Sequence, residues 1–175
     1  VMLLALYAAT VKAGGVYLPL NTGYTAAELD YFLGDAKPRI VVAGTEAADA
    51  VAPLAVRGGA TLFTLDADET GSLADAAAQH APTFTAVPRG SEDLAAILYT
   101  SGTTGRSKGA KLCHRNLLSN AMVLRDYWRF SADDVLLHML PIYHTHGLFV
   151  ASNLLAMVGG SMIFLPKFSA DVAMR

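Results

Sequence analysis

Apolar residues fall into blocks of helix length and strand length that alternate along the chain. A capping-box pattern, Thr25 with Glu28 three residues later, opens one of the helical blocks. Short runs rich in Val, Ile, Leu, Phe and Thr separate these blocks and predict strands, and the run at 39–44 is apolar enough for full burial. In the first half we expect helices at 2–12, 25–37, 46–55 (interrupted at Pro53) and 72–81, and strands at 16–20 (an end or edge, because of Pro19), 39–44 and 61–65.

The second half repeats this alternation after a change in composition. Residues 81–92 are rich in Pro, Thr, Ser and Gly, which indicates a connecting loop or a boundary between two substructures. Ser169 has the character of a helix N-cap, and a Gly159-Gly160 pair ends the helix before it. Here we expect strands at 93–100, 134–140 and 162–165, helices at 114–128 and from 147 to 157, and a short final helix after Ser169.

This alternation predicts an α/β fold of helices and mainly parallel strands, with helices on both faces of the sheet. Ligands of such sheets bind beyond the carboxyl ends of the strands. Two polar segments occupy that position here. They are YTSGTTGRSKG at 99–109, which we expect to join a buried strand directly to a helix, and PIYHTHG at 141–147.

Composition excludes several classes of protein. Of 175 residues 53% are hydrophobic and 16% charged, so disorder is excluded, and the net charge of −2 offers no basic surface for nucleic acid. The single cysteine, Cys113, suits a reducing compartment, so we expect the cytoplasm, or the mitochondrion in a eukaryote. Residues 147–166 carry no charge, but Asn153 and the glycine pair favour a buried helix, turn and strand over a membrane span. Oligomeric state leaves no signal in the sequence.

The segment at 99–109 has the chemistry of a phosphate-binding loop. Its three glycines allow close approach of backbone N–H groups, and its hydroxyls, Arg106 and Lys108 add further donors. Phosphate oxygens accept without donating, so a loop made of donors suits a polyphosphate. The spacing is not that of a P-loop, because Gly105 and Lys108 are not adjacent. The alternative is a flexible Gly/Ser linker, which the position after a buried strand disfavours.

The stretch YTSGTTGRSKG also resembles the signature phosphate loop of the adenylate-forming superfamily, which includes acyl-CoA synthetases, luciferases and peptide-synthetase adenylation domains. Two further stretches carry the resemblance, KAGGVYLPLNTGYTAAELDYFLGDAKPRIVVA and LPIYHTHGL, and Ser107 departs from the proline of many members. Within the superfamily, DYWRF, DDVLLHMLPIYHTHGLFVASN and GSMIFLPKF look most like the malonyl-CoA synthetases. The resemblance implies an AMP-forming acid–CoA ligase that uses ATP, Mg²⁺ and coenzyme A and activates a short dicarboxylate, malonate first.

The same resemblance assigns roles to individual residues. Lys108 would neutralise the departing pyrophosphate, and His144 would position the carboxylate at the α-phosphate; read without the family, His144 is an ordinary turn histidine. Thr100 would be a ligand of Mg²⁺ or simply a strand-ending hydroxyl. The implied ATP-binding residues are Thr100, Ser101, Gly102, Thr103, Thr104, Gly105, Arg106, Ser107 and Lys108. The implied acid-binding residues are His144, Thr145, His146 and Gly147.

Other interpretations of these residues are weaker. A metal site made of His138, His144 and His146 is disfavoured, because the first lies on a predicted strand and no acidic or cysteine ligand is near in sequence. Ser101 lacks the preceding glycine of a hydrolase nucleophile elbow. A noncatalytic ATP-binding module, another acyl-CoA synthetase, an adenylation domain and an orthophosphate-releasing ATPase stay open as alternatives. We expect residues 1–175 to be part of an N-terminal AMP-binding domain, inactive alone, whose C-terminal domain with a catalytic lysine follows Arg175.

Overall fold

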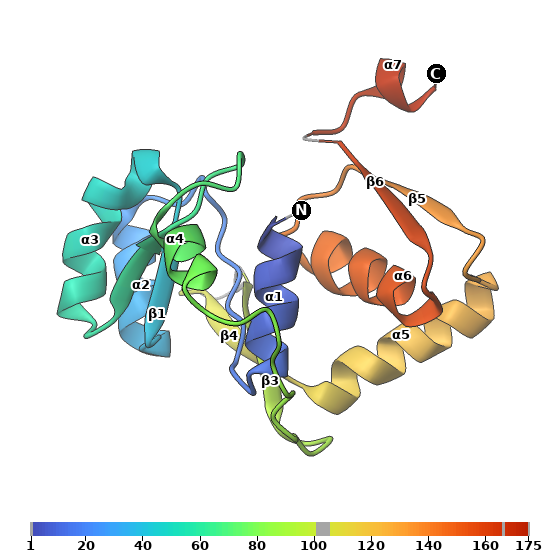
Figure 1. The fold of residues 1–175 in the computed structure, drawn as a ribbon, viewed down its shortest axis with the longest axis horizontal. Coiled ribbons are helices and arrows are strands. Elements are labelled where there is room, and N and C mark those ends of the chain that lie inside the picture. The colour runs from blue at the N-terminus through green and yellow to red at the C-terminus, as the bar shows by residue number, and fades with distance from the viewer. Residues whose placement is uncertain (1, 101–105, 166, 175) are drawn as a thin grey trace. The chain divides into compact units, whose positions relative to one another are not determined.

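A computed structural model describes residues 2–100, 106–165 and 167–174 (Figure 1). The fold is α/β, as predicted, and within the described residues it contains three two-stranded sheets, two parallel and one antiparallel. The chain divides into two compact units. The first unit holds Leu3–Asn21 and Ala86–Arg175, and the second holds Thr22–Thr85 with Met2.

The second unit is a parallel strand pair with helices packed around it. The Thr25 capping box forms as predicted, with the Glu28 side chain accepting from the Thr25 backbone N–H at 2.8 Å. Phe32 and Leu33 on one helix and Val51 and Ala55 on the next are its buried apolar side chains. Its elements are α2 (Ala26–Ala36), β1 (Ile40–Ala43), η1 (Thr45–Ala47), α3 (Ala48–Arg57), β2 (Thr61–Thr64) and α4 (Ser72–Ala78).

Two expectations for this unit are wrong in detail. The strand β1 is not fully buried, because Ile40 is 56% exposed and the rest of the strand is only half-buried. Pro53 lies inside α3 without interrupting it. Proline removes one backbone hydrogen bond, but the buried Val51 and Ala55 on either side hold the helix in place by packing.

The first unit contains an antiparallel hairpin flanked by a short extended segment. Strand β3 (Leu94–Thr100) pairs with β4 (Lys108–Cys113), and Tyr17 bridges to Ala96 on the other side of β3 in a parallel sense. Tyr17 is the single bridging residue described in the predicted strand at 16–20, since Pro19 has no N–H to extend the ladder. The helix α1 (Met2–Lys12) precedes this segment, as predicted.

The rest of the first unit is a second α/β layer. Helices α5 (His114–Trp128) and α6 (Asn153–Val158) lie beside the parallel pair of β5 (Val135–His138) and β6 (Ser161–Phe164) (Figure 1). A wide π-helical turn, η2 (His146–Ser152), leads into α6, and α7 (Ala170–Ala173) ends the described chain with Ser169 as its N-cap. The apolar stretch considered above as a membrane span contains η2, α6 and β6. No helix among the described residues is long and apolar enough to cross a bilayer.

Candidate active site

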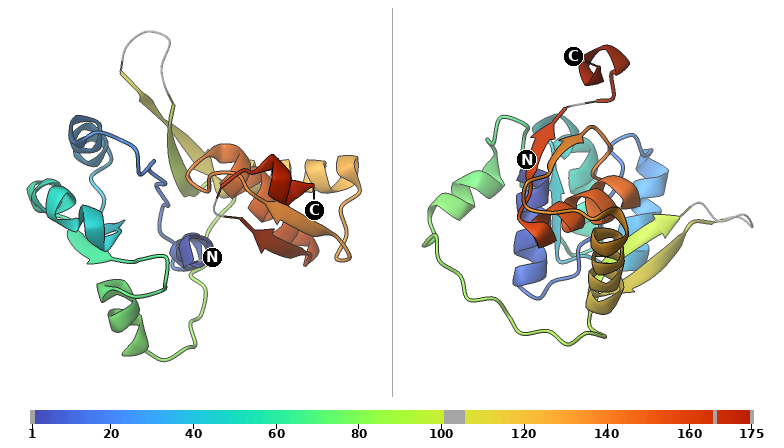
Figure 2. Two further views of the ribbon diagram at one scale, coloured as in Figure 1. Left: turned by 90° about the horizontal axis from the view of Figure 1, so that it is seen from above. Right: turned by 90° about the vertical axis from the view of Figure 1, so that its right-hand side faces the viewer.

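The predicted phosphate loop connects the two strands of the hairpin (Figure 2). The expectation that it joins a strand directly to a helix is wrong, because β4 intervenes before α5 begins at His114. In the antiparallel register Thr100 is the partner of Lys108, and both side chains are exposed. Directly opposed residues project from the same face of an antiparallel pair, so these two predicted ligands stand next to each other.

The remaining residues of the predicted loop divide between described and undescribed positions. Arg106 is exposed and Ser107 half-buried, and both precede β4 directly. Gly109 in β4 packs closely, since a Cβ there would stand 3.1 Å from the Ile97 Cγ2 atom and 3.5 Å from the Tyr99 ring. Outside the described residues lie Ser101, Gly102, Thr103, Thr104 and Gly105.

The second predicted segment forms a tight turn between β5 and η2. The His144 N–H donates to the Pro141 carbonyl at 3.2 Å, and the Leu148 N–H donates to the His144 carbonyl at 2.9 Å. The side chains of His144, Thr145 and His146 are exposed. The two imidazole rings stack with centroids 5.7 Å apart and planes 6° apart, which presents two ring edges together at the surface.

Gly147 is buried directly beneath this turn. A Cβ atom at that position would lie 2.3 Å from the carbonyl oxygen of Pro141 and 2.8 Å from its carbonyl carbon. Real Cβ contacts are never that short, so any other residue would force the backbone of the turn apart. The predicted acid-binding residues therefore share one turn whose shape depends on a glycine.

Two buried polar side chains hold the Gly147 carbonyl. The His138 Nε2 atom lies 2.8 Å from the Gly147 oxygen, and the Ser152 hydroxyl donates to the same oxygen at 2.8 Å. A carbonyl only accepts, so this contact requires that Nε2 carry a proton. His138 is 2% exposed, and its ring stacks on Phe164 with centroids 4.7 Å apart.

The hairpin of β3 and β4 shares one hydrophobic cluster with the segment that follows the turn at 141–147, called the histidine turn below. Ala96 and Leu98 of β3 are buried together with Leu148 and Phe149 of η2. Residues 96, 98 and 100 project from the same face of a strand, so the Thr100 side chain lies on the face of β3 that packs against η2. The cluster thus fixes the base of the phosphate loop relative to the turn that carries His144.

Aromatic side chains extend this cluster toward α1. The Tyr7 ring meets Tyr17 and Phe149 edge to face, with centroids 5.3 and 5.6 Å apart, and its hydroxyl donates to the Asn153 Oδ1 atom at 3.2 Å. Burial raises the pKa of Tyr7, and burial together with the neighbouring Tyr7 raises the pKa of Tyr17 to about 12. Both phenols therefore stay protonated at neutral pH and serve as packing and hydrogen-bonding groups.

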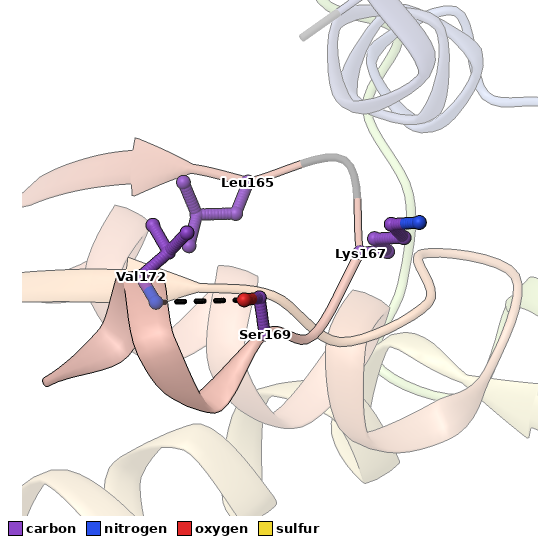
Figure 3. A pocket seen from close by; sticks show the side chains of 4 residues that line it. All are labelled: Leu165, Lys167, Ser169 and Val172. Atoms are coloured by element: carbon purple, nitrogen blue, oxygen red, sulfur yellow. Dashed lines mark hydrogen bonds between the residues drawn. The ribbon is translucent and has the colours of Figure 1, made fainter.

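A shallow pocket lies away from these residues, near the last helix. It has a volume of about 220 Å³ and is lined by Leu165, Lys167, Ser169 and Val172 (Figure 3). Ser169 is occupied in capping α7, where its hydroxyl accepts from the Val172 N–H at 3.4 Å. The pocket contains none of the residues that the sequence assigns to chemistry.

The described residues contain no group of three or more His, Cys, Asp or Glu side chains able to hold a metal ion. Thr100, proposed as a magnesium ligand, offers a hydroxyl oxygen of the hard type that Mg²⁺ accepts, at an exposed strand end beside Lys108. Thr100 would supply one oxygen ligand to such an ion.

Sequence reasoning missed two members of the site. The sequence presented His138 as a disfavoured metal ligand on a predicted strand, and Ser152 lies within a stretch that predicted a buried apolar helix. Both are the kind of residue that is mostly exposed or only partly buried, so a histidine and a serine inside otherwise apolar predicted elements were the available signal. Their partner, a backbone carbonyl, has no signature in the sequence.

Comparisons with known proteins agree on the family. The family model described as "AMP-binding enzyme" matches residues 1–175. The mitochondrial malonate–CoA ligase ACSF3 of Mus musculus is 39% identical over 166 residues, which cover 93% of this chain and 27% of that protein. The crystal structure of ATP-bound MatB from Rhodopseudomonas palustris has a TM-score of 0.95 and 62% identity, covering 98% of this chain and 34% of that one.

A further solved structure is described as a malonyl-CoA ligase ternary product complex with methylmalonyl-CoA and AMP bound. It has a TM-score of 0.75 and 31% identity, and the match covers 97% of this chain and 34% of that one. This chain therefore spans about a third or less of the length of the proteins it resembles. With the family model matched from the first residue to the last, the chain belongs to the AMP-binding enzyme family.

Proposed function

We propose that the full-length protein of which this sequence forms part is an AMP-forming acid–CoA ligase that activates malonate. The observation that carries the proposal is the joint placement of the two predicted sites. Thr100 and Lys108 are paired at the loop end of the hairpin, and the strand that bears Thr100 shares a buried cluster with the helix that follows His144. Donors for a polyphosphate and a polar turn for an acid are thus fixed to one core.

The chemistry proceeds in two steps. A carboxylate oxygen of the acid attacks the α-phosphorus of ATP, and an O–P bond forms as the bond to pyrophosphate breaks. The thiol of coenzyme A then attacks the acyl carbonyl and AMP leaves, while the thiol proton passes to solvent. Lys108 stabilises the charge that accumulates on the departing pyrophosphate, because a fixed cation acts where charge develops. His144 holds the acid near the α-phosphate, which is a positioning role.

Magnesium supplies charge neutralisation on the phosphates when bound, with the Thr100 hydroxyl as its protein ligand. The resemblance assigns the residues from Ser101 to Ser107 to the same phosphates as hydrogen-bond donors. Thr145 and His146, exposed beside His144, favour a short polar acid over a long alkyl chain.

Names of the relatives support the choice of acid and cofactors. The mouse protein is named a malonate–CoA ligase, MatB was solved with ATP, and the product complex contains methylmalonyl-CoA and AMP. The mouse relative is also named mitochondrial, whereas the cytoplasmic location expected here stays a prediction.

The test is exchange of labelled pyrophosphate into ATP by the full-length protein, with a panel of acids. We expect exchange that depends on malonate, with methylmalonate second, and malonyl-CoA formation once coenzyme A is added. Exchange with another acid only would replace malonate but keep the ligase class. ATP binding without any acid-dependent exchange would indicate a noncatalytic module, and release of orthophosphate would indicate an ATPase.

A further inference from the structure

His138 and Ser152 are the buried polar side chains of the described chain, 2% and 5% exposed. They come from different elements, the end of β5 and the end of η2, fourteen positions apart. Buried polar groups are retained where their hydrogen bonds are satisfied, because an unsatisfied one is strongly destabilising. The structure satisfies this pair with a single acceptor.

That acceptor is the Gly147 carbonyl, which receives a hydrogen bond from each of the two side chains. The distances are 2.8 Å from His138 Nε2 and 2.8 Å from the Ser152 hydroxyl, and the two side chains are 3.4 Å apart. The imidazole is in turn held by its stack on Phe164 of the neighbouring strand β6. The orientation of one peptide group is therefore fixed by two side-chain donors.

The orientation of this peptide determines the shape of the turn above it. Gly147 follows His146 directly and lies against the Pro141 carbonyl without room for a Cβ atom. The segment that contains Gly147, η2, is π-helical, a rare geometry that is frequent at functional sites and whose backbone hydrogen bonds differ from those of an α-helix. Rotation of the Gly147 peptide would move the exposed rings of His144 and His146 with the backbone.

We propose that His138 and Ser152 are positioning residues, which act through the Gly147 carbonyl to hold the His144–His146 turn in its acid-binding shape. The proposal rests on the function proposed above, since it assigns that turn to the acid. It requires that loss of either donor raises the KM for the acid much more than the KM for ATP. The phosphates of ATP are assigned to the hairpin, which these donors do not contact.

Steady-state kinetics of pyrophosphate exchange in the full-length protein test this split. Ser152→Ala and His138→Phe each remove one donor, and His138→Phe keeps a ring to stack on Phe164. Loss of one buried hydrogen bond predicts a rise of about tenfold in the KM for the acid, with the KM for ATP changed less than about twofold. Ser152→Thr and His138→Gln retain a donor and are expected to recover most of the loss.

Phe164→Leu is the matched control. It removes the stacking ring beneath the imidazole but leaves both donors to Gly147, so it should lower the melting temperature without raising the KM for the acid. Equal changes in the KM values for acid and ATP in Ser152→Ala and His138→Phe would overturn the proposal. So would failure of both Ser152→Thr and His138→Gln to recover any of the loss.

A second measurement does not depend on catalysis. Amide hydrogen exchange by mass spectrometry in the ligand-free protein should rise in a peptide covering residues 142–153 for Ser152→Ala and His138→Phe, and stay unchanged there for Phe164→Leu. If the wild-type protein exchanges no pyrophosphate with any acid, the proposed function fails, while this peptide still reports on the hydrogen bonds. Unchanged amide exchange in the donor-deleted variants would defeat the positioning role by itself.

Discussion

The hairpin and the histidine turn organise their functional residues in different ways. Thr100 and Lys108 are exposed and are brought together by the backbone ladder between β3 and β4. His144 and His146 are also exposed, but their turn rests on a buried glycine and two buried side-chain donors. Backbone pairing needs no particular side chain, whereas the turn depends on buried residues of specific types.

The hairpin and the turn therefore differ in what a substitution is expected to change. Substitutions on the hairpin should change interactions with phosphate and leave the fold intact, because the replaced side chains contact solvent. Substitutions beneath the turn should disturb both the local fold and the use of the acid. Both regions lie in the first unit, so a substitution in the second unit serves as a reference for stability effects alone.

The largest effect is expected from Gly147→Ala. Its methyl group would meet the Pro141 carbonyl at 2.3 Å, and the backbone of the turn must move to relieve the clash. Overpacking of this kind is destabilising by about 1–3 kcal/mol, and the displaced turn should reduce acid-dependent pyrophosphate exchange by at least about 100-fold. Chemical denaturation and the exchange assay on the full-length protein measure the two effects.

Gly34→Ala is the control for adding a methyl group. No atom lies within 4 Å of a Cβ built at Gly34, which sits inside α2 of the second unit. Alanine is favoured over glycine in a helix by roughly 0.5–1 kcal/mol, so this variant should be more stable and fully active. If Gly147→Ala proves as stable and as active as Gly34→Ala, the shape of the turn does not depend on a glycine. The contrast between the hairpin and the turn would then be removed.

On the hairpin, Lys108→Met should reduce exchange by about 100-fold, the typical effect of removing one group that stabilises developing charge. The loss should appear in kcat more than in the KM for the acid, with the melting temperature nearly unchanged, because Lys108 is exposed. Lys111→Met is the matched control on the same strand. Lys111 pairs with Ile97 and projects from the other face of the hairpin, so its loss should be neutral.

A smaller effect is expected from Thr100→Val, which keeps the β-branched shape and removes the hydroxyl. If Thr100 is a magnesium ligand, the concentration of Mg²⁺ needed for half-maximal exchange should rise about tenfold, and Thr100→Ser should restore it. A hydroxyl that only ends the strand predicts the same magnesium dependence in all three proteins. Titration of MgCl₂ at fixed total ATP distinguishes the two roles.

Local patterns predicted the elements of this chain, whereas pairing and burial were harder to predict. The helix at 114–128 and the capping box at Thr25 were correct because their signals, amphipathic spacing and side-chain caps, lie within a few residues. The strand β4 was missed because KGAKLC has two lysines and a glycine and no β-branched or aromatic residue, and this mostly exposed strand forms through its pairing with β3. Because β4 was not predicted, the expectation that the phosphate loop leads directly from a strand to a helix was also wrong.

The candidate site shows the same division. Glycines, hydroxyls and cations between predicted elements indicated the hairpin loop and the turn, since these residues are unusual in such positions. His138 and Ser152 act through a backbone oxygen that three-dimensional folding brings to them, and no spacing rule connects residues 138, 147 and 152. Residues predicted to contact a ligand were therefore easier to identify from the sequence than residues that support their backbone.

The smallest effect is expected in the second unit, from Glu28→Gln. Hydrogen bonds from the Thr25 backbone N–H and hydroxyl lower the pKa of Glu28 in the folded protein. A lowered pKa means that the carboxylate stabilises the fold above its unfolded value, about 4.3, and that this contribution is lost as the pH falls through the folded value. The melting temperature of wild type should therefore exceed that of Glu28→Gln at pH 7, and the gap should close below about pH 4.3. Pyrophosphate exchange at pH 7 should be the same in both proteins, since the substitution changes neither the hairpin nor the turn. A loss of exchange without a change in melting temperature would mean that residues outside those two regions contribute to function.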